Sequence, residues 1–65
     1  MYRVLEAEMV LNDVSRKDIA EALGVTIGTL SLKLNDKAPI TLHEARTIKA
    51  TVGTSKTIDE LFKEE

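Results

Sequence analysis

Apolar residues recur every three or four positions through most of this chain, the spacing that places them on one face of an α-helix. In residues 2–12 this pattern puts Tyr2, Leu5 and Met9 on one face. Helices in small proteins gain most of their stability from packing, so we expect this helix to pack on those that follow. Part of its apolar surface is also a candidate contact with a second subunit.

A glycine separates two short helical patterns in the middle of the chain. Ser15 is the expected N-cap of the first, and Asp18, three residues later, completes a variant of the capping box. The helix is therefore expected to start near Arg16. Gly24 follows Leu23 at the position where helices often end in the left-handed conformation, which glycine adopts without a steric penalty. The chain is predicted to turn there.

The second helix of this pair is expected to begin after Thr26, a good N-cap, with Leu30 and Leu34 facing inward. Val25 is an apolar anchor for the corner between the two helices. Ala20 is small, as two crossing helices require where they approach closely. Together these features predict two helices at a steep angle joined by a short glycine-containing turn, the helix-turn-helix unit.

Two capping boxes mark two further helices. Thr41 and Glu44 open the first of them, which Gly53 ends, and Thr57 and Glu60 open the second. Apolar residues at helical spacing form the expected inner face of the longer helix: Leu42, Ala45, Ile48 and Val52.

The last helix is short and carries the only phenylalanine, Phe62. We expect this side chain first to cover the core and second to contact another subunit. Residues 54–56 ahead of the helix are expected to be a polar connector. A chain of 65 residues has room for one domain, residues 1–65, and the pattern predicts an all-α bundle of about five short helices.

Residues 15–52 resemble the lambda-repressor-like, Cro-type helix-turn-helix family of phage and bacterial transcriptional regulators. The motif's small residue, its glycine and the following apolar residue match Ala20, Gly24 and Val25. The stretch TLSLKLNDKAPITLHEARTIKATVG also resembles the recognition helix, loop and fourth helix of small phage-type members. The resemblance implies a compact all-α domain that binds duplex DNA at an operator as a homodimer, reading half-sites about 34 Å apart. The matching inner anchors are Ile19, Leu23 and Leu30.

The resemblance also implies which residues face DNA, because the N-terminal and outward residues of a recognition helix reach base edges. The outward residues of the expected recognition helix include no Arg, Gln or early Asn that could make bidentate contacts with a base. Ser31 and Thr26 are suited to bases or phosphates, and Ile27 or Leu32 to a thymine methyl, so we expect weak or largely apolar readout. Gly28 costs roughly 1 kcal/mol relative to alanine inside a helix, so either a local feature favours this glycine or the helix is loose. The candidates are Thr26, Ile27, Gly28, Thr29, Ser31, Leu32 and Asn35.

Four basic residues are candidates for phosphate contacts. Arg16 and Lys17 lie in the first turn of the leading helix, where the helix dipole also favours an anion. Lys33 and Lys37 flank the far end of the recognition helix. Each of them alone is most simply an ordinary solvated charge. Together with the motif they favour a duplex footprint, in which phosphate contacts position the protein.

The net charge has the wrong sign for a simple nucleic-acid binder, at −2 with an isoelectric point near 5.3. The acidic residues are peripheral, however. Residues 14–52 hold six basic and four acidic residues, whereas the two ends together hold three basic and seven acidic ones. The region that resembles the regulators therefore carries +2 and the ends −4.

Composition excludes several other classes. Contents of 43% apolar and 31% charged residues indicate a soluble globular chain, and the lack of cysteine favours a cytoplasmic protein without disulfides or thiolate metal sites. No apolar run is long enough to cross a membrane. Catalytic arrangements, phosphate loops and metal-binding clusters are absent, so we expect no enzyme, cofactor or small-molecule substrate. His43 is expected on the surface and not as a metal ligand.

Two alternatives to a dimeric DNA-binding regulator stay open. In one, the chain is a helix-turn-helix scaffold that binds protein, as an antirepressor or regulatory adaptor does. In the other, it binds DNA as a monomer. Ile27, Leu32 and the acidic ends favour protein binding, whereas the four basic residues favour DNA.

Overall fold

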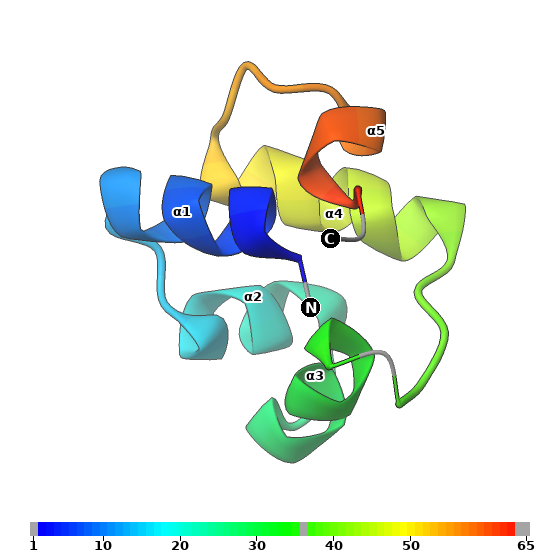
Figure 1. Cartoon of the computed structure of the whole chain (residues 1–65). Coiled ribbons are helices and arrows are strands. Elements are labelled where there is room, and N and C mark those ends of the chain that lie inside the picture. Colours follow the sequence, from blue (N-terminus) through cyan, green and yellow to red (C-terminus); the bar gives the residue numbers. More distant parts are fainter. Residues whose placement is uncertain (1, 36, 64–65) are drawn as a thin grey trace.

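The computed structural model describes residues 2–35 and 37–63, and every regular element within them is an α-helix (Figure 1). The chain is therefore all-α, as the sequence predicts. None of these helices has the length and apolar character needed to cross a bilayer. The described helices are α1 (Arg3–Leu11), α2 (Arg16–Leu23), α3 (Ile27–Leu34), α4 (Leu42–Val52) and α5 (Ile58–Leu61).

Both ends of α2 lie where the sequence predicts. The Ser15 hydroxyl accepts a hydrogen bond from the backbone N–H of Asp18 at 3.2 Å, and the Asp18 carboxylate accepts one from the backbone N–H of Ser15 at 3.0 Å. This reciprocal pair satisfies two amide groups that a helix start leaves without partners. At the other end Gly24 is left-handed, with φ 72° and ψ 31°, so the chain turns directly into α3.

The two later capping boxes are also confirmed. The Thr41 hydroxyl accepts from the Glu44 N–H at 3.1 Å, and the Glu44 carboxylate accepts from the Thr41 N–H at 3.0 Å. Thr57 and Glu60 repeat the arrangement at 3.1 and 3.0 Å. Gly53 ends α4 in the left-handed conformation, with φ 74°. With Thr26 capping α3 as predicted, local sequence accounts for the starts of four helices and the ends of two.

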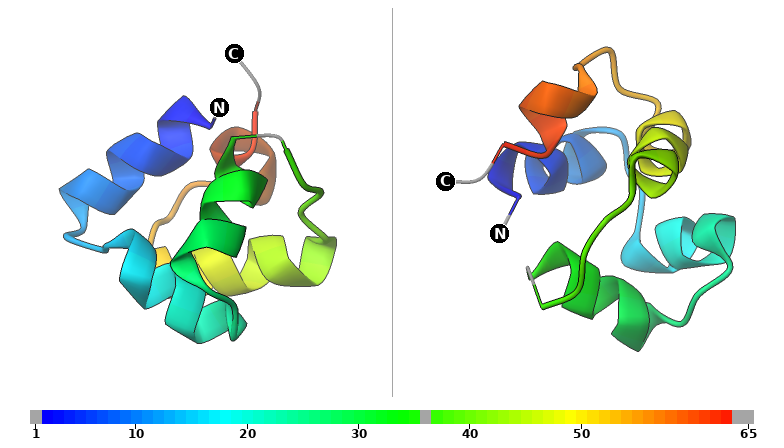
Figure 2. Two further views of the ribbon diagram at one scale, coloured as in Figure 1. Left: turned by 90° about the horizontal axis from the view of Figure 1, so that it is seen from below. Right: turned by 90° about the vertical axis from the view of Figure 1, so that its right-hand side faces the viewer.

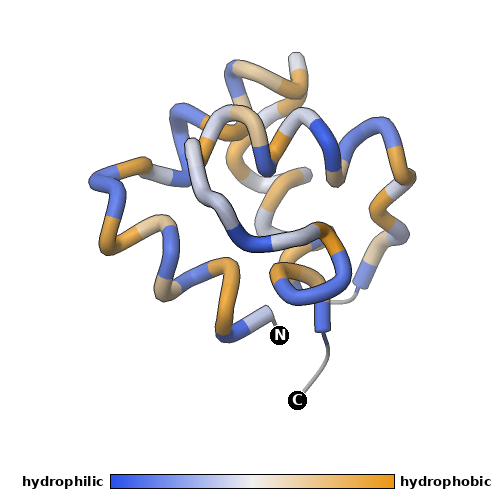
Figure 3. Tube along the Cα trace, turned by 90° about the horizontal axis from the view of Figure 1, so that it is seen from above, coloured by the Kyte–Doolittle hydropathy of each residue, from blue (hydrophilic) through white to orange (hydrophobic). Residues whose placement is uncertain are grey.

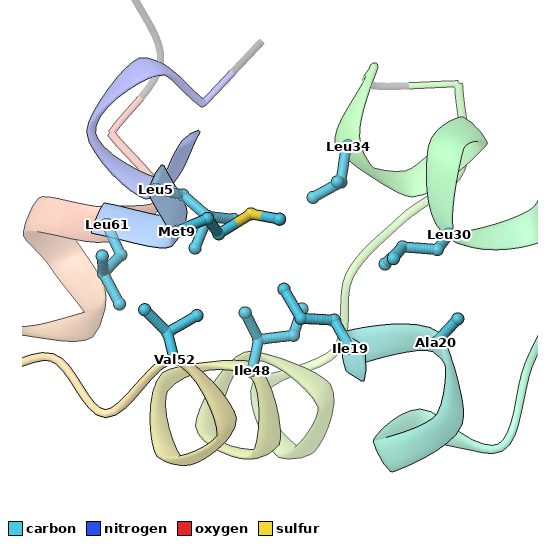
Figure 4. Close-up of a cluster of buried hydrophobic side chains, with 9 residues drawn as sticks. All are labelled: Leu5, Met9, Ile19, Ala20, Leu30, Leu34, Ile48, Val52 and Leu61. Atoms are coloured by element: carbon cyan, nitrogen blue, oxygen red, sulfur yellow. The ribbon is translucent and has the colours of Figure 1, made fainter. Parts of the chain in front are cut away.

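Helix α4 packs on both α2 and α5, while α1 packs on α5 and α3 packs on α2 (Figures 1 and 2). Apolar and polar positions alternate along the helices with the helical period (Figure 3). The apolar ones meet in one continuous cluster, to which all five helices contribute (Figure 4). Its buried side chains are Leu5, Met9, Ile19, Ala20, Leu30, Leu34, Ile48, Val52 and Leu61.

The prediction that Leu42 faces the core is wrong. Its side chain is 58% exposed, whereas Ala45, three residues later, is buried as predicted. Leu42 is the first residue of α4, at the end of the helix that extends past the buried cluster. There it lines a shallow open groove together with Ile40, Ile58 and Phe62.

Phe62 packs against the core, which agrees with its predicted role as a cover. Its ring meets that of Tyr2 edge to face, with centroids 5.2 Å apart and planes at 74°. Such aromatic pairs are favourable beyond the area they bury. Leu61 beside it is fully buried, so α5 closes the bundle against α1.

The connector before α5 is not simply polar, because Thr54 is buried with 8% of its surface exposed. Its hydroxyl donates to the Glu8 carboxylate of α1 and accepts from the backbone N–H of Lys56 at 3.0 Å. The Lys49 ammonium also approaches the Thr54 carbonyl at 3.5 Å. Thr54 therefore links α1, α4 and the connector.

The three capping carboxylates make the fold sensitive to acid. A hydrogen bond from the backbone N–H of the N-cap residue is the main cause that holds the pKa of Asp18, Glu44 and Glu60 below its ordinary value. A pKa lowered by folding contributes stability that is present above the ordinary carboxyl range and lost as pH falls through it. We expect the urea midpoint to be steady near neutral pH and to fall below about pH 4.

The matched variant combines Asp18→Asn, Glu44→Gln and Glu60→Gln, which keep the side-chain sizes and remove the titration. It should be less stable at pH 7 and should lose less of its urea midpoint between pH 6 and pH 3. An equal acid-induced loss in both proteins would show that other carboxylates cause the sensitivity.

Candidate nucleic-acid interface

Helix α3 buries one face and exposes the other. Leu30 and Leu34 reach the core, with 0% and 2% of their surfaces exposed. Ile27 and Leu32 expose 48% and 51%, so both large apolar side chains lie partly open to solvent. The helix lies at the edge of the molecule opposite α5 (Figures 1 and 2). The other predicted DNA-facing residues of α3 and its C-cap are Gly28 and Asn35, both exposed, and Thr29 and Ser31, both partly exposed.

The N-terminal threonines of α3 are engaged with each other. The Thr26 hydroxyl accepts from the Thr29 N–H at 3.1 Å and donates to the Thr29 hydroxyl at 3.0 Å. Thr26 is thus an N-cap first, and a contact between its hydroxyl and a base requires that its donated bond be exchanged. This arrangement leaves the outward surface of α3 mainly apolar.

Gly28 is exposed in the first turn of α3, yet neither a positive φ nor a tight contact in the described chain accounts for a glycine there. Positive φ occurs at Gly24 and Gly53 but not at Gly28. A Cβ added at Gly28 would meet only the Thr26 hydroxyl oxygen, at 3.9 Å, an ordinary contact distance. In a helix interior, glycine is less favourable than alanine by roughly 1 kcal/mol. Neither backbone conformation nor internal packing offsets that loss.

Lys33, a predicted phosphate contact, is used inside the molecule. Its ammonium donates to the Pro39 carbonyl at 3.0 Å and to the Glu44 carboxylate at 3.2 Å. The side chain exposes only 14% of its surface. The same Glu44 carboxylate caps α4, so Lys33 ties the end of α3 to the start of α4 and is a poor candidate for binding DNA.

Arg16 also has an internal partner, because its guanidinium lies 2.8 Å from the Glu6 carboxylate of α1. Both side chains remain more than one-third exposed, at 37% and 35%. Exposed ion pairs of this kind contribute little, typically below 1 kcal/mol. The Arg16 charge is therefore available to a phosphate group in exchange for Glu6.

Lys17 and Lys37 are exposed, and no carboxylate in residues 2–35 and 37–63 pairs with either of them. Lys17 lies in the first turn of α2, the helix on which α3 packs. The backbone N–H of Lys37 donates to the Leu32 carbonyl at 2.8 Å, which holds this residue against the end of α3. Residues 22–35 between them contain no acidic residue.

The structure thus divides the predicted residues into two groups. The outward set lies on α3 with exposed Lys37 at its C-terminal end and exposed Lys17 on the neighbouring α2, whereas Lys33 and Arg16 turn towards carboxylates of other helices. Sequence analysis did not identify Glu6 or Glu44 as their partners. These residues are ten and eleven positions away from the basic residues they bind, and only the tertiary fold brings them close.

Within the described ranges no group of three His, Cys, Asp or Glu residues is suited to hold a metal ion. His43 is exposed, as the sequence predicts. The buried side-chain nitrogen and oxygen atoms of this part of the chain all have hydrogen-bond partners. The exposed face of α3 is therefore the strongest candidate site.

Compared with protein-family models, with curated proteins and with solved structures, the chain matches none of them.

Proposed function

We propose that this chain binds duplex DNA through the exposed face of α3 and regulates transcription in the cytoplasm of a phage-infected or bacterial cell. The observation that carries the proposal is an outward helix surface without acidic residues, with exposed Lys37 held at its C-terminal end and exposed Lys17 on α2, the helix that packs on α3. The major groove of B-DNA, about 12 Å wide, admits one α-helix. Phosphates on both sides of the groove are then in reach of cationic side chains.

The arrangement of α2 and α3 supports the same proposal. Two eight-residue helices are joined through a left-handed glycine, and the second helix is the one whose outward face is exposed. In the helix-turn-helix proteins that residues 15–52 resemble, the second helix enters the major groove. The proposal includes a homodimer that reads two half-sites, and that part rests on the resemblance alone.

The phosphate contacts proposed here differ from the four candidates of the sequence analysis. Lys17 and Lys37 are the primary contacts, and Arg16 joins them by exchanging Glu6 for a phosphate group. Lys33 is left out because its ammonium is bound to Glu44 and Pro39.

The salt dependence of binding to a fluorescent mixed-sequence duplex tests this assignment. Each phosphate contact releases counterions, so Lys17→Ala and Lys37→Ala should each lower the slope of log K against log salt by about one. Lys63→Ala, at an exposed position after α5, is the matched control and should leave the slope unchanged. Equal slopes for all four proteins would remove these lysines from the interface.

Protein binding is the second candidate, because one observation favours it. Ile27 and Leu32 expose large apolar surfaces in a chain whose net charge is −2. Apolar helix faces commonly bind a groove of another protein. This candidate replaces the first if the chain fails to bind any duplex at low salt and Leu32→Ala disrupts a protein complex.

A further inference from the structure

The exposed face of α3 contains a patch of bare helix backbone. Gly28 supplies it, and its helical neighbours are Ile27 beside it, Ser31 one turn later and Leu32 four residues later, on the same side. The two apolar side chains are half exposed, so they border the bare patch without being covered by the rest of the protein.

The reason for a glycine at this position lies outside the free protein. Its backbone does not require glycine, and a methyl group would fit without a clash. Where glycine is favoured neither by conformation nor by packing, close approach of another molecule to the backbone is its remaining structural use. A bound molecule that uses this patch would place a small apolar group on the Gly28 backbone, next to Leu32 one turn later and to Ile27 before it.

Duplex DNA offers one group that fits this description. In the major groove the thymine C5-methyl is the apolar feature of the base edges, while guanine, adenine and cytosine present hydrogen-bonding atoms. The α3 surface has no Arg, Lys, Gln or Asn among residues 27–32 to bind those atoms. The acid-free stretch 22–35 and the exposed Lys17 and Lys37 complement the phosphates on either side.

We propose that Gly28, Ile27 and Leu32 form a seat for the thymine C5-methyl group, so that the chain prefers sites with thymine at the centre of the contact. This inference rests on the proposed DNA binding and specifies which chemical group on the DNA is read. The Ser31 hydroxyl at the border bonds to any base or phosphate and adds little discrimination.

The first test compares four 20-base-pair duplexes that differ in the C5-methyl group. They are alternating A·T, the same duplex with deoxyuridine in place of thymidine, alternating G·C, and G·C with 5-methylcytosine. Burial of one methyl group strengthens binding about fourfold. We expect thymine over uracil and 5-methylcytosine over cytosine, each by at least that factor. The comparison of 5-methylcytosine with cytosine separates the contribution of the methyl group from the effect of A·T base pairs on duplex shape.

The second test is Gly28→Ala, which fills the seat. Alanine should raise the melting temperature of the free protein by roughly 3–6 °C, because it favours the helix. The same change should weaken binding to the A·T duplex about tenfold or more and abolish the difference between thymine and uracil. His43→Ala is the matched control, since it also favours a helix at an exposed second position, that of α4, but adds no atom at the seat, and it should keep that difference.

The outcomes separate the inference from the proposal beneath it. Binding to all four duplexes with equal affinity would overturn the methyl seat and leave DNA binding in place. Full binding by a stabilised Gly28→Ala protein would also overturn it. Failure to bind any of the four duplexes at low salt would overturn both the seat and the proposed function.

Discussion

Leu30→Ala is expected to destabilise the protein by about 2–5 kcal/mol, the usual cost of deleting a fully buried leucine side chain. Leu30 is 0% exposed and joins α3 to the core shared with Ile19 and Ala20. A domain of 65 residues has a free energy of unfolding of only about 3–10 kcal/mol. The variant should therefore be substantially unfolded at moderately elevated temperature, and α3 should be lost with it.

Urea denaturation followed by circular dichroism measures this effect. Leu32→Ala is the control, since it removes the same atoms from the same helix at a position that is 51% exposed. Its free energy of unfolding should change by no more than about 0.5 kcal/mol. Similar losses in the two variants would contradict the inward and outward assignment of α3.

Leu32→Glu is expected to produce the largest loss of DNA binding with little loss of stability. The substitution places a carboxylate on the exposed face of α3, within the acid-free stretch 22–35. Facing the phosphates of a duplex, a like charge costs several kcal/mol, which corresponds to a hundredfold or greater loss of affinity. Because Leu32 is half exposed, the fold should tolerate the glutamate.

Leu11→Glu is the matched control for this second prediction. Leu11 is also a leucine in the last turn of a helix, is 76% exposed, and lies on α1. The affinity of the Leu11→Glu protein for a mixed-sequence duplex at low salt should remain within a few-fold of that of the unchanged protein. The small difference expected is the general effect of one added negative charge. Equal losses in both variants would show that net charge, and not the face of α3, controls binding.

Local features of this chain were predictable from the sequence because they depend on a few neighbouring residues. The capping boxes at Ser15, Thr41 and Thr57 each need only a hydroxyl and an acid three residues apart. The left-handed turns at Gly24 and Gly53 need only a glycine after a helix. Helical spacing likewise identified most of the core.

Features that depend on tertiary packing were not predictable in the same way. Leu42 fits the inner stripe of α4 by spacing, but it lies at the end of the helix and remains exposed. Thr54 looks like part of a polar connector, yet α1 covers it and Glu8 binds it. Lys33 has the position of a phosphate ligand in the sequence pattern, but in the folded chain its ammonium binds the Glu44 carboxylate. Each depends on which helices meet, and helical periodicity does not contain that information.

Both the sequence and the structure were needed to recognise Gly28 as a candidate contact. The sequence identified a glycine that weakens a helix, and the structure excluded conformational and packing reasons for it. The contact of its backbone with DNA stays a prediction, as does the role of every residue on the exposed face of α3.

Selection of fragments from a random duplex library, at low and at near-physiological salt, tests the central claim most directly. We expect a shared site to be retained at both salt concentrations, with thymines at the centre of each contact. For a homodimer, two such half-sites should be related by a palindrome and lie about 34 Å apart. Retention only at low salt, with no shared sequence, would contradict readout by α3 and turn attention to a protein partner for Ile27 and Leu32.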